Sequence, residues 1–494
     1  MKKKHAEKII LLVSAMLLAG GLCSAALAEK SPEIPYFDLP NTVDTIKVGL
    51  KSGTTAVSSA VLENRVGSGY EFGIFDLARG FNFVGYTGQQ SITVQGDTGF
   101  VLGDGTVCGC WHIMLNATYA DFESARSAAN SVYGFPASIK GAYRVLVGSY
   151  QSADDAKNAA AYAGLDGSAY TGGSSSVIVR AGTSAQIVFM FDFEGLRHLA
   201  VRPISADAPA ETWYLGNAYR GSFEFIRNPG NSKITLVNYV PLEDYVRGVA
   251  PYEMPGSWSE EAIKAQTVCA RTYAANNING YAERGFDVRC DTYSQVYKGV
   301  LDITDKIAGI VDSTCGSYVR YRGNICKVYY MSADGGSTES SANVFSQKRA
   351  YLSGVADPTE LEMDYYNKEW SISVSESRLA SILSTDDVSL ADIAEFKLTK
   401  SELGNVIAAE AVDSNGNSVR IDGEYCFRDL YLYSLRYDVE RSTLPSGSDV
   451  FVFKGNGWGH NCGMSQWGAY SLAKNYGYGC GDIISFYFSG AYVA

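Results

Sequence analysis

The chain has 494 residues, of which 46% are hydrophobic, and a formal net charge of −12. This length exceeds that of one ordinary core and predicts two or three globular domains. The acidic balance argues against nucleic acid and anionic lipid as partners, because the long-range field of the protein repels both. The 34 tyrosines suit well-filled β-sheet cores or contacts with polar ligands, since each offers an apolar ring and a hydroxyl.

The first 28 residues are typical of a secretory signal peptide. A lysine-rich start precedes an apolar run at residues 9–22, and Ala26 and Ala28 form a small-residue cleavage site. The run is shorter than the roughly 20 residues that span a bilayer. We therefore expect cleavage after Ala28 and an extracytoplasmic protein, which only an uncleaved segment would anchor to the membrane.

Ten cysteines are present, one of them in the predicted signal peptide, and the chain has only four histidines. Cys108 and Cys110 are too close in sequence for an easy mutual disulfide, and the other cysteines show no Cys-x-x-Cys pair or zinc spacing. We predict that most cysteines are small buried hydrophobic residues, with at most one or two bridges, and that the chain has no metal site.

Strand patterns dominate residues 29–140, which we predict to be β-rich. Residues 46–50 alternate between apolar and polar types, and short runs follow at 56–62, 70–75 and 91–94. Gly, Ser and Asn turns separate these runs, as is typical of short strands.

Residues 141–193 predict a small α+β module inserted into the β-rich chain. A strand at 142–150 precedes an Ala-rich helix at 156–162 and strands at 177–180 and 185–191. The first strand carries the pattern Tyr143, Val145, Gly148 and Tyr150. This opening resembles the SPOR domain, a module that binds peptidoglycan glycan strands stripped of their peptides. A plain α/β insertion explains the same pattern.

The region 194–494 begins with strands and continues into the segment that contains the candidate catalytic residue. Residues 219–227 and 233–240 predict a hairpin, which delivers the chain into residues 240–255. This segment contains apolar residues at helical spacing, which predicts one buried helix face: Leu242, Tyr245, Val246 and Val249.

Two prolines, Pro251 and Pro255, bracket Glu253. Because helices tend to end before proline, we expect Glu253 on a short, stiff connection rather than inside a helix. Ser257 and Glu260 have the spacing of a capping box, which predicts the start of the next helix.

Glu253 stands among apolar neighbours, where desolvation would raise its pKa and suit it to general acid work. An ordinary surface glutamate in a turn is the alternative. Glu243 and Asp244 are candidates for a second carboxylate, but we interpret them as a solvated helix face near the helix N-terminus, where the dipole favours negative charge.

Five segments of the chain carry a family resemblance. The first, residues 240–273, contains the run from Val240 through Glu253 to Tyr273. Four others follow in order, at residues 291–299, 329–339, 351–358 and 457–470. Together they resemble the core of stage II sporulation protein D (SpoIID) and the related amidase-enhancer proteins.

The resemblance implies a β-rich, mixed α+β catalytic unit. It would comprise residues 29–140 and 194–494, with the SPOR-like module at 141–193 inserted and the signal peptide at 1–28. The implied activity is that of a lytic transglycosylase, which cleaves the MurNAc-GlcNAc bond in peptide-stripped peptidoglycan of the cell wall. The family's catalytic glutamate matches Glu253.

One carboxyl group suffices for such an enzyme, whereas ordinary glycosidases use two. The glutamate protonates the glycosidic oxygen and then deprotonates the 6-hydroxyl of the substrate, which leaves a 1,6-anhydroMurNAc end. Two other functions stay open. One is a non-enzymatic, peptidoglycan-binding activator of an N-acetylmuramoyl-L-alanine amidase, and the other is a glycan hydrolase that uses water.

The matching segments also supply candidates for contact with glycan strands. Gln266 and Tyr273 are two helical turns apart and share a face. His460 lies in a Gly-rich loop, where its imidazole is able to bind sugar or hold the loop. The full set of substrate-binding candidates is Arg247, Gln266, Arg271, Tyr273, Gln295, Ser332, Gly335, Gly336, Tyr351, His460, Ser465 and Gln466.

Some relatives carry a zinc site with His-Cys immediately before the loop glutamine, which is Gln295 here. Tyr293 and Ser294 occupy those two positions, and Cys290 has the wrong spacing. We therefore expect no zinc, no other cofactor and a structural role for Cys290.

Overall fold

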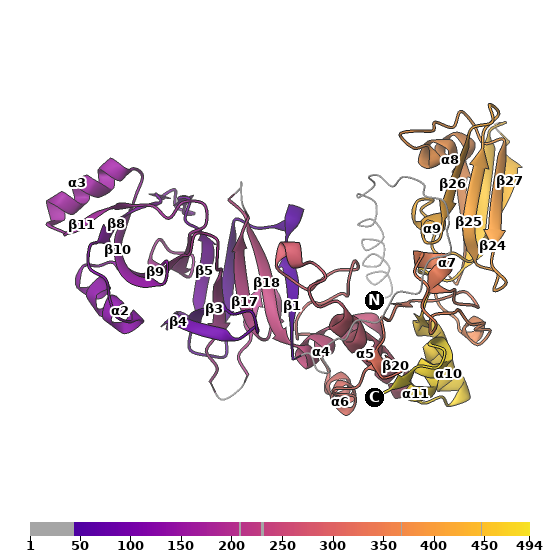
Figure 1. Ribbon diagram of the computed structural model, residues 1–494, viewed down its shortest axis with the longest axis horizontal. Coiled ribbons are helices and arrows are strands. Elements are labelled where there is room, and N and C mark those ends of the chain that lie inside the picture. Colours follow the sequence, from indigo (N-terminus) through magenta and orange to yellow (C-terminus); the bar gives the residue numbers. More distant parts are fainter. Residues whose placement is uncertain (1–43, 207–208, 229–231, 367, 446) are drawn as a thin grey trace. The chain divides into compact units, whose positions relative to one another are not determined.

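The computed structural model describes residues 44–206, 209–228, 232–366, 368–445 and 447–494 (Figure 1). The predicted signal peptide lies outside the described residues. Helices and strands are both frequent, which confirms the mixed α+β class. Among the residues that the structure describes, no helix has the length and apolar character needed to cross a membrane.

The chain forms two compact units. The smaller unit contains Ala333–Pro358 and Asp364–Cys462. The larger unit contains the described residues from 44 to 332, together with Thr359–Met363 and Gly463–Ala494. The last 32 residues therefore return to the unit that the first part of the chain builds.

A seven-stranded sheet in the larger unit holds the strand that leads to Glu253. The predicted hairpin is confirmed, because β17 pairs antiparallel with β18. On its other side β18 pairs with β1. The strand order is β19 (Val288–Arg289), β1 (Thr45–Lys51), β18 (Ile234–Pro241), β17 (Ser222–Arg227), β14 (Leu199–Pro203), β3 (Tyr70–Phe75) and β4 (Phe81–Thr87).

A ten-stranded sheet forms the other β layer of the larger unit (Figure 1). Its strand order is β11 (Gly167–Tyr170), β8 (Trp111–Leu115), β10 (Ala142–Tyr150), β9 (Phe135–Ile139), β13 (Ile187–Asp192), β12 (Val177–Ala181), β5 (Ser91–Gly96), β2 (Ser59–Asn64), β15 (Thr212–Tyr214) and β16 (Asn217–Tyr219). A short hairpin joins β6 (Phe100–Val101) to β7 (Val107–Cys108).

Strands β8 to β11 and two helices, α2 (Phe122–Ser131) and α3 (Ala153–Ala163), form a β-α-β-β-α-β unit. The helix predicted at 156–162 lies within α3. Helix α2 was not predicted, although Asp121 caps it and Phe122, Ala125 and Ala129 give it a buried face. This unit begins at β8, because α2 and β8 complete its packing.

Hydrophobic clusters lie on both faces of the sheet in this β-α-β-β-α-β unit. On one face, Ala125 and Ala129 of α2 pack with Val145, while Ala156 and Ala160 of α3 pack with Ile113. On the other face, side chains of neighbouring strands close the core: Phe135, Ala137, Ile139, Leu146, Ile178, Ile187 and Met190.

A helical layer completes the larger unit around α5 (Glu260–Asn276), most of which is buried. Helices α4 (Leu242–Glu253), α6 (Asp305–Ser313), α10 (Gln466–Tyr476) and α11 (Cys480–Tyr487) all pack against it (Figure 1). The C-terminal helices join through β29 (Met464–Ser465), which pairs parallel with β22 (Tyr330–Met331). A three-stranded sheet contains β21 (Asn324–Ile325), β20 (Val319–Tyr321) and β30 (Tyr492–Val493).

The smaller unit contains two three-stranded sheets whose aromatic side chains meet. Phe396 of one sheet contacts Phe451 and Phe453 of the other. The first sheet has β24 (Glu395–Lys400), β25 (Val406–Val412) and β26 (Ser418–Asp422), and the second has β23 (Glu369–Ser375), β28 (Asp449–Asn456) and β27 (Tyr437–Thr443). Its helices are α7 (Ser341–Phe345), α8 (Glu376–Leu383) and α9 (Tyr425–Arg428).

Candidate active site

Glu253 is the last residue of α4, and Pro251 lies inside the final turn of this helix. The expectation that Glu253 stands on a separate connection is therefore wrong. Pro251 removes one backbone hydrogen bond from this turn, and the helix ends two residues later, at Glu253. The predicted buried face of α4, from Leu242 to Val249, is confirmed.

Helix α5 begins at Glu260, and its N-cap is Ser259, which makes no side-chain capping bond. The predicted capping box of Ser257 and Glu260 is thus wrong. A turn in which the Trp258 N–H donates to the carbonyl of Pro255 at 3.0 Å delays the helix start. The turn connects Glu253 to the buried helix that carries Gln266.

The carboxyl group of Glu253 accepts hydrogen bonds from side chains that are distant in sequence. The hydroxyl of Tyr330 donates to Oε1 at 3.1 Å. The Nε2 of Gln466 donates to Oε2 at 3.1 Å and to Oε1 of Gln266 at 3.3 Å. The backbone N–H of Val296 also donates to this carboxyl group. All these partners are donors.

Burial raises the pKa of Glu253 from 4.5 to about 7, and the donors Tyr330, Gln466 and Val296 oppose this rise. The position of the carboxyl group at the C-terminal end of α4 acts in the same direction as burial, because the helix dipole disfavours a negative charge there. The residue remains partly exposed. A carboxyl group with this pKa exchanges a proton readily near neutral pH.

Gln295 and two tyrosines form hydrogen bonds that hold the donors of the Glu253 carboxyl group in place. Gln295 is 1% exposed, and its Nε2 donates to the hydroxyl of Tyr330 at 2.8 Å. Its Oε1 accepts from the hydroxyl of Tyr245 at 3.1 Å. Sequence reasoning missed both tyrosines as site residues, although Tyr330 lies in one of the matching segments and Tyr245 lies on the predicted buried face of α4.

Of the substrate-binding candidates, the structure brings Gln266, Gln295 and Gln466 together around Glu253. Tyr273 is close enough for the charge of Glu253 to affect it, and Ser294 hydrogen-bonds to its hydroxyl. Gln266 is completely buried, and its Nε2 has no hydrogen-bond partner among the residues that the structure describes.

The two arginines among the candidates form ion pairs within the protein. Arg271 is completely buried, and its guanidinium makes two bonds to the carboxylate of Glu243, at 2.8 and 2.7 Å. Arg247 pairs with Asp244 at 2.7 Å and also with Asp312. Their geometry gives both arginines a role in stabilising the packing of α4, α5 and α6.

The interpretation of Glu243 and Asp244 as a solvated helix face is wrong. Glu243 pairs with the buried Arg271, and Asp244 pairs with Arg220 at 3.0 Å as well as with Arg247. Both carboxylates are engaged, because the turn of α4 that carries them faces basic side chains rather than water.

Two serine candidates have backbone roles in the larger unit. Ser465 is buried, and its hydroxyl accepts from the N–H of Gly468, which caps α10. The carbonyl of Ser332 accepts from the N–H of Trp467 at 3.0 Å. Both bonds fix the start of the helix that presents Gln466.

The remaining candidates, Gly335, Gly336, Tyr351 and His460, belong to the smaller unit. Tyr351 is completely buried. The Nδ1 of His460 accepts from the N–H of Cys462 at 3.1 Å, and its ring packs against Phe345. Glu253 belongs to the larger unit.

Eight cysteines, namely Cys108, Cys110, Cys269, Cys290, Cys315, Cys426, Cys462 and Cys480, are free thiols, so the expected bridges are not formed among them. The thiol of Cys290 donates to the carbonyl of Leu50 at 3.5 Å. Within the described ranges, no group of three or more His, Cys, Asp or Glu side chains is arranged to hold a metal ion.

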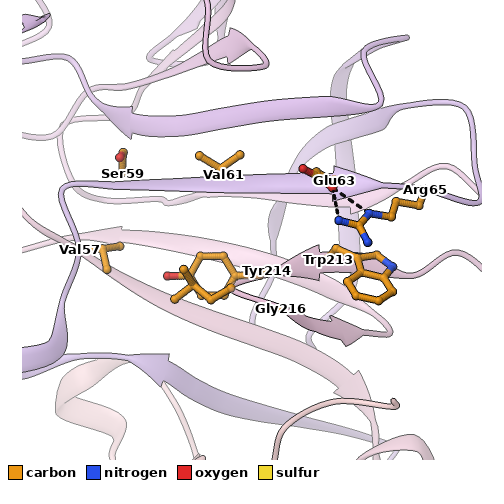
Figure 2. A pocket seen from close by; sticks show the side chains of 9 residues that line it. Val57, Ser59, Val61, Glu63, Arg65, Trp213, Tyr214 and Gly216 are labelled. Carbon is orange, nitrogen blue, oxygen red and sulfur yellow. Dashed lines mark hydrogen bonds and ion pairs between the residues drawn. The ribbon is translucent and has the colours of Figure 1, made fainter. Parts of the chain in front are cut away.

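A pocket of about 310 Å³ lies on the ten-stranded sheet (Figure 2). Its charged side chains satisfy each other, because Arg65 pairs with Glu63 at 2.7 Å and lies 4.0 Å above the ring of Trp213. Its lining consists of Val57, Ser59, Val61, Glu63, Arg65, Trp213, Tyr214, Leu215 and Gly216.

Comparisons with known proteins find relatives over the part of the chain that contains Glu253. A family model described as SpoIID, stage II sporulation protein, matches residues 230–321, which include Glu253, Gln266 and Gln295. An uncharacterized protein of Brachyspira hyodysenteriae is 33% identical over 287 residues, which cover 56% of this chain and 72% of the relative.

Two named relatives come from Bacillus subtilis. Stage II sporulation protein D is 28% identical over 273 residues, which cover 52% of this chain and 76% of the relative. An amidase enhancer is 26% identical over 321 residues, which cover 56% of this chain and 44% of that relative. The matched family model, these relatives and the ordered sequence motifs agree, and the chain belongs to the SpoIID family.

Proposed function

We propose that the protein is a lytic transglycosylase that cleaves MurNAc-GlcNAc bonds in peptide-stripped peptidoglycan, with Glu253 as both acid and base. The observation that carries this proposal is the carboxyl group of Glu253, which has a pKa of about 7 and whose hydrogen-bond partners are all donors. The named relatives, a sporulation protein and an amidase enhancer, support a role in the cell wall.

In the first step, protonated Glu253 gives its proton to the glycosidic oxygen. The bond from this oxygen to C1 of MurNAc breaks, and positive charge develops at C1. The Glu253 carboxylate then takes the proton of the MurNAc 6-hydroxyl as O6 bonds to C1. The products are a 1,6-anhydroMurNAc end and a free GlcNAc hydroxyl, and Glu253 is protonated again.

The donors around Glu253 suit both steps. Tyr330, Gln466 and Val296 stabilise the carboxylate that forms when the proton leaves. Because these groups point their hydrogens at the carboxyl oxygens, they do not compete for the acid proton. The proton therefore stays available to a substrate oxygen.

A hydrolase is less well supported, because a water-activating enzyme needs a second carboxylate. The nearest candidates in sequence, Glu243 and Asp244, are held in ion pairs. An amidase activator without cleavage activity remains the second candidate, since one relative is named an amidase enhancer.

We also propose that the protein acts outside the cytoplasm, where peptidoglycan lies, as the signal-like residues 1–28 suggest. Glycan affinity of the SPOR-like segment is a further part of the proposal.

The test is to incubate the purified protein with amidase-treated peptidoglycan and to identify the products by mass spectrometry. We expect 1,6-anhydroMurNAc ends, and we expect Glu253→Gln to abolish cleavage while glycan binding is retained. Glu283→Gln is the matched control, because the Glu283 side chain is 82% exposed and should leave activity unchanged.

Other outcomes point elsewhere. Reducing MurNAc ends would indicate a hydrolase. Stimulation of a separate amidase without any cleavage would indicate an activator. Full activity of Glu253→Gln would exclude Glu253 as the acid.

A further inference from the structure

A line of hydrogen bonds runs from the interior of the larger unit to the carboxyl group of Glu253. The hydroxyl of Tyr245 donates to Oε1 of Gln295, and Nε2 of Gln295 donates to the hydroxyl of Tyr330. Tyr330 then donates to Oε1 of Glu253. The three supporting side chains come from α4, from the loop after β19 and from β22.

The direction of this line is fixed by one carbonyl group. Nε2 of Gln295 also donates to the carbonyl of Ala270 at 3.3 Å, and a carbonyl oxygen only accepts. The amide of Gln295 therefore has to present its nitrogen to Ala270 and to Tyr330. Since the hydroxyl of Tyr330 accepts from Gln295, its own hydrogen is left to point at Glu253.

The tyrosines keep their protons near neutral pH. The ionisable side chains that the described residues place against Glu253 are Tyr245 on α4, Tyr273 on α5 and Tyr330 on β22. Burial raises the pKa of each of these phenols. The nearby side chain from α10, Gln466, is an uncharged amide. Glu253 is therefore the group that changes charge in this cluster.

We propose that Gln295 is a positioning residue that holds the hydroxyl of Tyr330 as a donor to Glu253 and thereby sets the pH at which this acid gains and loses its proton. Gln295 thus acts through Tyr330 rather than on the substrate. Its near-complete burial, at 1% exposure, agrees with this role and not with the sugar contact expected from the sequence.

The consequence for activity rests on the proposed function. A donor to a carboxylate favours the charged form, so loss of the Tyr330 donor makes Glu253 a weaker acid. Protonation of the glycosidic oxygen then slows. Because the acid has to be protonated before the reaction, the pH above which activity falls moves upward.

The experiment is a titration of the substrate-free protein, labelled with 13C at the glutamate carboxyl groups and followed by NMR. Exposed glutamates titrate near their ordinary pKa, and the signal absent from Glu253→Gln identifies Glu253. We expect Tyr330→Phe to raise the pKa of Glu253 by about one pH unit. Gln295→Glu should raise it at least as much, since its carboxylate accepts from Tyr330 and adds negative charge.

Two further variants guard against simple unfolding. Gln295→Met removes the amide without burying a charge, and it should give a smaller rise in the same direction. Tyr297→Phe is the control, because Tyr297 contacts Tyr245 but its hydroxyl donates to Asn238 at 3.0 Å, outside the line. It should lower stability and leave the pKa of Glu253 unchanged.

An unchanged Glu253 titration in Tyr330→Phe would overturn the proposal, and so would an unchanged titration in both Gln295 variants. A pKa shift as large in Tyr297→Phe as in Tyr330→Phe would also overturn it, by showing a general packing effect. The pH profile of glycan cleavage is the second readout. If the pKa shifts but no variant or parent cleaves glycan, this inference holds and the transglycosylase proposal fails.

Discussion

At the scale of single residues, the burial of Glu253 raises its pKa, as the proposed function requires, but lowers the stability of the folded protein when the residue is ionised. Its neighbours bury a carboxyl group at the end of a helix, and the resulting pKa of about 7 means that the ionised form is disfavoured in the folded protein. Three donors reduce this penalty without removing it. The protein therefore sacrifices some stability for an acid that works near neutral pH.

Because the ionised form of Glu253 destabilises the folded protein, we predict a pH-dependent gain in stability for Glu253→Gln. The folded-state pKa lies above the unfolded value of 4.5, so folding is favoured at low pH and loses stability as pH rises from about 4.5 to about 7. Gln is neutral throughout. At pH 8 the variant should be more stable by about 1 to 3 kcal/mol, and at pH 4.5 the difference should vanish.

Urea denaturation at both pH values measures this prediction. A variant that is equally or less stable than the parent protein at pH 8 would show that the carboxylate is well solvated. Glu283→Gln, at an exposed position, should show little difference at either pH.

At the scale of elements, α5 is the centre of the helical layer. It presents Gln266 to Gln466, and its buried Arg271 reaches back to Glu243 near the start of α4. Arg271 also donates to the carbonyls of Val311 at the end of α6 and of Ser317 beyond it. One guanidinium thus connects α4, α5 and α6, which fixes the helix whose last residue is Glu253.

Arg271→Met should therefore destabilise the larger unit by about 3 kcal/mol, because it leaves Glu243 and two carbonyl groups without their partner. Urea denaturation checks this value. The control is Arg284→Met, since Arg284 is 45% exposed and its nearest carboxylate oxygen is 3.9 Å away. An equal loss in both variants would show that the buried pair contributes nothing specific.

At the scale of the whole molecule, the C-terminal segment belongs to the core of the larger unit. Met464, Leu472, Ile483 and Ile484 are all buried, and α10 and α11 pack against α5. The same segment delivers Gln466 to Glu253. The packing of the C-terminal segment therefore completes both the core of this unit and the group of side chains around Glu253.

Ile484→Ala should cost about 2 to 4 kcal/mol, because it leaves a cavity in a fully buried position. Hydrogen–deuterium exchange should show faster exchange in α5 and unchanged exchange in β23 and β28 of the smaller unit. Tyr478→Ala, at a position that is 36% exposed, is the control. Faster exchange in both units would contradict the division into two compact units.

The sequence by itself determined the features that neighbouring residues encode. It indicated the hairpin before α4, the buried face of α4 and the helix at α3, because side-chain periodicity acts over a few residues. It misplaced the start of α5, where tertiary packing decides the boundary.

Only the tertiary structure decided which groups surround the acid. Tyr330 is 77 residues from Glu253 and Gln466 is 213 residues away, and no local pattern encodes such pairings. The same long-range packing engages Arg271, Glu243 and Gln295, which the sequence presented as surface or substrate-binding groups, in hydrogen bonds within the protein. A hydrogen bond depends on direction as well as proximity, so the donors that control the proton of Glu253 emerge only when the strands and helices that carry them are in place.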